Sequence, residues 1–214
     1  MSAHRTAPAA TPRHRFVTFA LWVLVATQGA CASSWPSRYY QLHSAVRLAL
    51  RDEATRPGAL VVGIGPVRVP DYLDRPEIVT VSGSRIDVAE FDRWAGSVEN
   101  NIARVLVEDL TGLLPTERFF VTHWRLRPPS PSCRIEVLVE HFEGPLQGPV
   151  LLRAQWFVHA ADGRLLLGRS SSISEEVTGG DYGALVEAMS RALEGLSQAI
   201  AKDITSLSPA QAAR

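Results

Sequence analysis

Two stretches of the chain repeat their apolar residues at helical spacing, and each follows a group of short strand-like segments. The first stretch lies within residues 90–115, where Ser97 is a suitable N-cap and Pro115 ends the pattern. The second covers residues 181–204 and has Asp181 as its candidate N-cap. The apolar stripes consist of Val98, Ile102, Val105, Leu106 and Leu113, and of Tyr182, Leu185, Val186, Met189, Leu193, Leu196 and Ile200.

The segments before each helix have the lengths and compositions of strands. They are residues 39–42, 59–69, 77–83, 84–88, 118–126, 133–144, 149–160 and 164–177. Gly83 and the pair Asp162-Gly163 mark hairpin turns. The order strands, helix, strands, helix predicts an α+β domain, with an antiparallel or mixed β-sheet and two α-helices packed on one face.

Some local predictions are specific enough for the structure to test. Pro66 indicates an edge strand or a bulge, because proline cannot donate to a sheet ladder. Trp94 fits an extra helical turn before Ser97, either as a core anchor or as an exposed contact aromatic. The carboxylate pairs Glu108-Asp109 and Glu175-Glu176 are interpreted as solvated surface.

The N-terminal region has the pattern of an export signal. Basic residues precede an apolar run over residues 16–26, which is shorter than the ~20 residues of a membrane-spanning helix. We expect a lipoprotein-type signal peptide over residues 1–30, a lipidated tether over 31–37, one domain over 38–205 and a disordered tail over 206–214.

The stretch from Gln28 to Cys31 resembles the processing box of bacterial lipoproteins, although Gln28 stands where that box usually has leucine. In this interpretation Cys31 is the lipid-attachment residue, and several acyl chains would anchor the protein stably to a membrane. The only other cysteine, Cys133, then keeps a free thiol at a strand start. The alternative is a disulfide, since an exported protein meets an oxidising compartment.

The charge balance and the absence of catalytic motifs in the sequence argue against several classes of function. With 22 basic and 22 acidic side chains, the chain lacks the basic footprint of a protein that mainly binds nucleic acid. It has no phosphate-binding loop, no Gly-x-Ser-x-Gly elbow and no zinc-ligand spacing. We therefore expect that the protein is not an enzyme, that it has no catalytic or metal site, and that it binds no cofactor. A hydrolase using His141 or His159, which could lie close together on adjacent strands, is the least favoured alternative.

The segment Val67–Val79 encloses the sequence Pro-Asp-Tyr-Leu-Asp-Arg-Pro, which is longer than a hairpin turn needs. One hypothesis is a docking loop stiffened by its prolines, with partner-binding residues Asp71, Tyr72, Leu73 and Arg75 and, farther along the chain, Trp94. The other is a structural corner, in which Tyr72 and Leu73 fill the edge of the core and an aspartate pairs with Arg75. Both hypotheses remain open on the sequence alone.

Three segments together resemble the paraquat-inducible PqiC family, the ABC-type transport auxiliary lipoproteins. They are "YYQL", "VVGIGPVRVPDYLDRPEIVT" and "EFDRWAGSVENNIARVLVEDLTGLL", in this order. The resemblance is strongest over residues 38–114, and its most specific part is the Pro70–Pro76 run with Arg93-Trp94 downstream.

This resemblance implies a non-enzymatic lipoprotein on the periplasmic face of the bacterial outer membrane. Its implied partner is an MCE-domain tunnel protein of a lipid transport system that supports membrane integrity, and the family's tendency to oligomerise implies a homo-oligomer. Phospholipid is a further candidate ligand. The alternative function is a lipid-binding carrier with an apolar cavity between sheet and helices, which would need a pocket of roughly 300–1,000 Å³.

Overall fold

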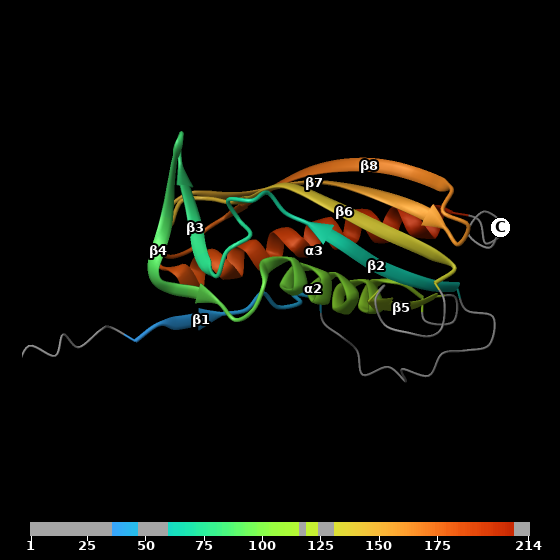
Figure 1. Cartoon of the computed structure of the whole chain (residues 1–214), viewed down its shortest axis with the longest axis horizontal. Coiled ribbons are helices and arrows are strands. Elements are labelled where there is room, and N and C mark those ends of the chain that lie inside the picture. Colours follow the sequence, from blue (N-terminus) through green and yellow to red (C-terminus); the bar gives the residue numbers. More distant parts are fainter. Residues whose placement is uncertain (1–35, 47–59, 116–118, 124–130, 208–214) are drawn as a thin grey trace, which may run out of the picture. The chain divides into compact units, whose positions relative to one another are not determined.

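The computed structural model describes residues 36–46, 60–115, 119–123 and 131–207 (Figure 1). By internal contacts the chain divides into Met1–Pro36 and Ser37–Arg214, and the elements below all belong to the second unit. Their order is β1 (Arg38–Tyr40), β2 (Leu60–Arg68), β3 (Glu77–Ser82), β4 (Arg85–Trp94), α2 (Val98–Leu113), β5 (Phe119–His123), β6 (Cys133–Glu143), β7 (Pro149–Ala160), β8 (Leu165–Glu176) and α3 (Tyr182–Ser206).

The strands form two sheets. The larger has the order β5-β2-β6-β7-β8, with β2 parallel to both of its neighbours and β6, β7 and β8 antiparallel. The smaller has the order β1-β4-β3, with β1 parallel and β3 antiparallel to β4. Two mixed sheets with two helices confirm the predicted α+β class.

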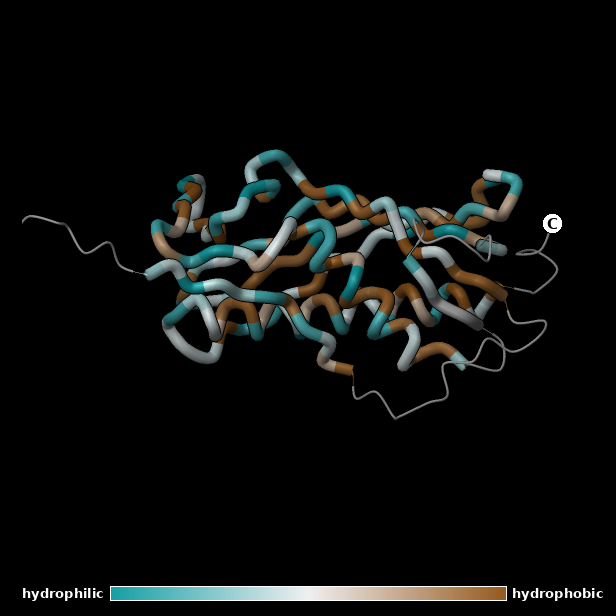
Figure 2. The backbone as a smooth tube through the Cα atoms, turned by 60° about the horizontal axis from the view of Figure 1, so that its bottom comes forward, coloured by the Kyte–Doolittle hydropathy of each residue, from teal (hydrophilic) through white to brown (hydrophobic). Residues whose placement is uncertain are grey.

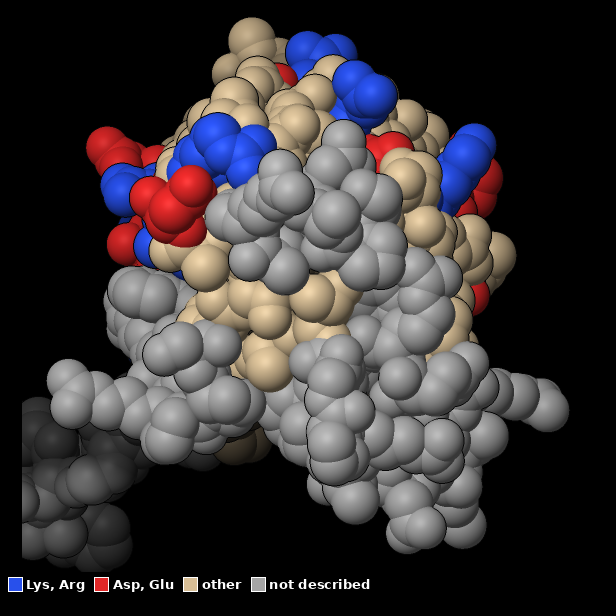
Figure 3. Space-filling model, turned by 90° about the vertical axis from the view of Figure 1, so that its right-hand side faces the viewer, with Lys and Arg blue, Asp and Glu red and all other residues tan. Residues whose placement is uncertain are grey.

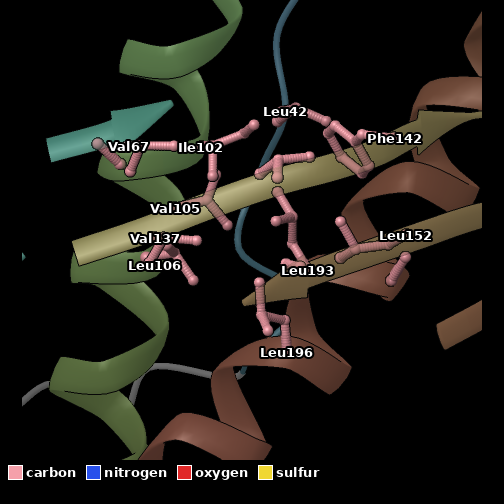
Figure 4. Packing of buried hydrophobic residues seen from close by; sticks show 14 of the residues in the cluster. Leu42, Val67, Ile102, Val105, Leu106, Val137, Phe142, Leu152, Leu193 and Leu196 are labelled. Atoms are coloured by element: carbon pink, nitrogen blue, oxygen red, sulfur yellow. The ribbon is translucent and has the colours of Figure 1, made fainter. Parts of the chain in front are cut away.

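Both helices lie against the larger sheet and contact each other. Helix α2 contacts β2 and β5, whereas α3 contacts β7 and β8. Alternate residues of β6, namely Cys133, Ile135, Val137 and Val139, are buried, as expected for a strand with one covered face. Figure 2 shows hydrophobic and hydrophilic residues alternating along these elements. Side chains of α2, α3, β6 and β7 meet in a shared core (Figure 4).

Both predicted N-caps are confirmed. Ser97 Oγ accepts a hydrogen bond from the Asn100 amide at 3.2 Å, and Asp181 Oδ1 accepts one from the Ala184 amide at 2.8 Å. At Pro66 the register shifts between Ile64 and Val67, so this proline marks a bulge in β2, a strand that has neighbours on both sides.

The predicted helical turn at Trp94 is wrong. Strand β4 continues through Trp94, which pairs with Tyr40 of β1, and its amide donates to the Pro76 carbonyl at 2.7 Å. Tertiary pairing therefore overrides the helical pattern over residues 90–94. The expected tail from residue 206 lies mostly outside the described residues, which end at Leu207.

Candidate functional site

The corner, residues 70–76, connects β2 to β3 through a compact turn. The Pro70 carbonyl accepts from the amides of Leu73 at 2.9 Å and Asp74 at 3.2 Å, and the Leu73 carbonyl accepts from the Arg75 amide at 2.9 Å. The bond from Trp94 to Pro76 ties the end of the corner to β4. These bonds restrict the corner to one conformation.

The inner side of the corner packs on the end of β6. Leu73 is buried, and the half-buried Tyr72 hydroxyl donates to Glu143 Oε2 at 2.9 Å. Glu143 is itself buried and also binds the Phe142 amide at 2.5 Å and His141 Nδ1 at 2.8 Å. Burial is the larger cause that raises the pKa of Tyr72, and the hydrogen bond to Glu143 is the next. The phenol therefore stays protonated and serves as a donor to the carboxylate.

The outer side of the corner carries charged groups. Asp71, Asp74 and Arg75 are exposed, and Arg75 Nε lies 3.3 Å from Glu77 Oε2. The other oxygen of Glu77, Oε1, lies 3.3 Å from Arg93 Nη2. Of the five predicted contact residues in the described part of the chain, Asp71 and Arg75 thus face solvent. Tyr72, Leu73 and Trp94 are directed into the fold, and Trp94 is only 5% exposed.

The segment 38–46 contributes polar contacts that the sequence did not indicate. Arg38 makes a bidentate pair with buried Asp92, with Nε–Oδ1 and Nη2–Oδ2 distances of 2.8 Å, and the Tyr40 hydroxyl donates to the same carboxylate at 2.7 Å. Burial and the bond to Asp92 raise the pKa of Tyr40 to about 12. Farther along, Leu42 enters the core and its carbonyl accepts from Arg104.

Asp109 is fully buried, so its interpretation as a solvated surface carboxylate is wrong. Ser44 Oγ lies 2.5 Å from Asp109 Oδ1, and Ser197 Oγ of α3 lies 2.8 Å from Oδ2. Burial raises the pKa of Asp109 despite these bonds, and nearby Glu194 and Glu108 raise it further. A sequence signal existed, because Asp109 follows the stripe residue Val105 by four positions and so shares its helix face.

The two histidines of the hydrolase hypothesis are far apart in the sheet register. His141 pairs with Arg153, whereas His159 pairs with Arg134, seven positions before His141 on β6. The two histidines therefore do not lie side by side, as the hydrolase alternative would require. Within the described residues, no group of three or more His, Cys, Asp or Glu side chains is arranged to hold a metal ion.

Of the two cysteines, Cys133 is buried at the first position of β6 and keeps a free thiol, whose pKa burial raises to about 11. Cys31, the predicted lipid-attachment residue, lies outside the described residues. Among the helices that the structure describes, none is long and apolar enough to span a membrane.

Comparison with known proteins identifies the family. The model of the ABC-type transport auxiliary lipoprotein component matches residues 40–201. The chain belongs to this family. The matched range includes the corner, Asp92, Asp109 and Glu143, and it ends within α3.

Solved structures support the same fold for this auxiliary lipoprotein. The crystal structure of an uncharacterized protein aligns with a TM-score of 0.64 at 21% identity, over 79% of this chain and 99% of that one. Protein XCC0632 from Xanthomonas campestris aligns with a TM-score of 0.60 at 13% identity, over 77% of this chain and 93% of that one. Among curated proteins, none matches the chain.

Proposed function

We propose that this auxiliary lipoprotein is a non-enzymatic adaptor of a lipid transport system. In this proposal Cys31 carries the lipid anchor, the domain lies on the periplasmic face of the outer membrane, and the corner docks an MCE-domain tunnel protein to support membrane integrity. The observation that carries the proposal is the corner itself. Its inner side is fixed by Tyr72, Leu73 and Trp94, while Asp71 and Arg75 are presented to solvent.

A fixed corner suits a docking role because binding then orders little additional chain. An interface loses free energy for every mobile group that it immobilises, and a preorganised loop reduces that loss. The backbone bonds within residues 70–76 and the Tyr72–Glu143 bond supply this preorganisation. In this role Tyr72, Leu73 and Trp94 position the exposed residues and do not themselves touch the partner.

The contacts of Arg38, at the start of the domain, are consistent with a protein that is anchored through the preceding segment. The bidentate pair between Arg38 and Asp92 fastens the chain to the domain directly after the proposed lipidated segment 31–37. A force applied at the lipid anchor would therefore be transmitted to the folded domain through the two hydrogen bonds between Arg38 and the buried Asp92 carboxylate. The proposed signal peptide, residues 1–30, would be removed before this arrangement forms.

The described core favours the adaptor over the lipid carrier. Side chains from both layers, including Ile102, Leu106, Val137, Leu152 and Leu193, are fully buried in one cluster (Figure 4). Close packing of this kind fills the interface between sheet and helices that a carrier would leave open for an acyl chain. The charges do not favour nucleic acid either, since 22 basic and 22 acidic side chains balance in the chain, and both signs are interspersed among the described residues on the end that Figure 3 shows.

The test is a crosslinked pull-down of the full-length protein from its native membranes. Asp71→Ala combined with Arg75→Ala should reduce capture of the tunnel protein at least about tenfold, as expected for the loss of interface anchors. Arg85→Ala is the matched control, because Arg85 is also an exposed arginine paired with a nearby carboxylate, Asp87, at 2.9 Å.

Two further measurements complete this test. Tyr72→Phe should weaken capture only to the extent that it loosens the corner, which hydrogen exchange of residues 70–76 would report. Mass spectrometry of the mature N-terminus should find an acylated Cys31. Undiminished capture by a folded double variant would reject the docking role of the corner.

A further inference from the structure

A row of side chains crosses the small sheet on its outer face, next to the corner. Tyr39 of β1 is the register partner of Arg93 in β4, and Arg93 is the partner of Glu77 in β3. Register partners project from the same face of a sheet, so these three side chains form one row. Their neighbours Arg38, Asp92 and Trp94 project from the opposite face, where Asp92 and Trp94 are buried.

Arg75 joins this row from the corner. Glu77 bridges the two arginines, with one oxygen 3.3 Å from Arg75 Nε and the other 3.3 Å from Arg93 Nη2. Two guanidinium groups against one carboxylate leave the row with one net positive charge.

The arginines have unused donors. A guanidinium carries five N–H groups, and the ion pairs with Glu77 use one nitrogen of each arginine. Arg93 Nε also lacks a hydrogen-bond partner within the described residues, but it is buried, so a partner would have to bind the terminal nitrogens of this side chain, which is 37% exposed. Next to these donors, Tyr39 is 66% exposed, the highest exposure among the large hydrophobic side chains that the structure describes as exposed. Tyrosine and arginine, together with tryptophan, are the residue types enriched among those that dominate binding energy at protein interfaces.

We propose that the row formed by Tyr39, Arg75, Glu77 and Arg93 binds an acidic segment of a protein partner. A carboxylate of that segment accepts from the two guanidinium groups, and an adjacent apolar group covers the Tyr39 ring. The inference rests on the proposed adaptor function and adds the chemistry of the partner. Asp71 and Asp74 lie in the preceding turn of the corner, so the surface places an acidic turn beside a basic row. The arginines therefore attract the acidic segment and the acidic turn repels it, so the segment docks in one direction only.

The experiment places a photoreactive phenylalanine at Tyr39 or at Asp71 of the full-length protein in native membranes. The result expected is capture of the same protein from both positions, with the peptide joined at position 39 containing Asp or Glu. Capture at position 39 should fall about tenfold or more when Arg75→Gln and Arg93→Gln are combined, and also on raising the salt concentration. Arg85→Gln, the exposed arginine of the β3–β4 hairpin, should leave it unchanged.

Glu77→Gln separates the inference from a folding defect. This variant frees both guanidinium groups and removes a negative charge, so it should increase capture at position 39. If the ion pairs only stabilise the fold, capture should instead decrease both in Glu77→Gln and in the combined Arg75→Gln and Arg93→Gln variant. Three outcomes would overturn the inference and leave the adaptor proposal standing. They are capture at Asp71 with none at Tyr39, a joined peptide without acidic residues, and capture at position 39 of only lipid or a second copy of this chain. Capture from neither position would overturn both.

Discussion

At the scale of single residues, Asp109 makes the stability of the fold depend on pH. The folded state raises the pKa of this carboxyl above its ordinary value of 3.8, mainly by burial. Between that value and the folded pKa, the folded protein binds more protons than the unfolded chain, so stability falls as pH rises through this window. The stability that protonated Asp109 contributes is fully present below a pH of about 4 and is lost once the pH exceeds the pKa of the folded state.

Asp109→Asn should remove this dependence. The amide keeps the size of the carboxyl but stays neutral, so the variant should unfold at a higher urea concentration than the wild type at pH 8, with a smaller difference at pH 4. Glu90→Gln is the control, because Glu90 is an exposed carboxylate of β4 and is not among the groups that act on the pKa of Asp109. Urea titrations over pH 4–8 provide the measurement. Parallel pH profiles for Asp109→Asn and the wild type would contradict the argument.

At the scale of elements, regular periodicity was sufficient to predict both long helices, their N-caps and the β6–β7–β8 meander. It failed where tertiary contacts decide the outcome. Residues 90–94 became strand because Trp94 pairs with Tyr40 and Pro76. Asp92 and Glu143 became buried acceptors through partners 52 or more positions away in the sequence. No local pattern specifies such partners, so the corner could be located from the sequence but not oriented.

Gly144 links the two sheets at the end of β6. Its carbonyl accepts from the Val81 amide of β3 at 3.3 Å, and a Cβ at this position would lie 2.6 Å from the Pro149 carbonyl oxygen. The clash is with backbone, which cannot move aside by a rotamer change.

Gly144→Ala should therefore destabilise the protein by about 2 kcal/mol, as overpacking typically does. Gly180→Ala is the matched control, because its added Cβ meets only the Gln147 side chain at 3.6 Å. Thermal unfolding followed by circular dichroism compares the two variants. Equal midpoints would mean that the chain between Gly144 and Val150 shifts without loss of stability.

At the scale of the whole unit, the segment 38–46 connects elements that are far apart in the sequence. It joins the small sheet through β1, contributes Leu42 to the core, and reaches both helices through Ser44–Asp109 and His43–Ser190. This segment is therefore an integral part of the fold. The boundary between tether and domain at residue 38 stays a prediction, although Arg38 already makes side-chain contacts with the folded domain.

Leu42→Ala tests whether this segment stabilises the whole unit. Leu42 is 1% exposed, so its truncation should leave a cavity and lower the free energy of unfolding by about 2–5 kcal/mol. Leu138→Ala removes the same atoms from the outer face of β6, where the side chain is 38% exposed, and should have a smaller effect. If segment 38–46 unfolds together with the rest, circular dichroism and tryptophan fluorescence will report the same lowered midpoint for Leu42→Ala. Two separate transitions, with the main one at the wild-type midpoint, would instead show that the segment detaches by itself and leaves the sheets and helices intact.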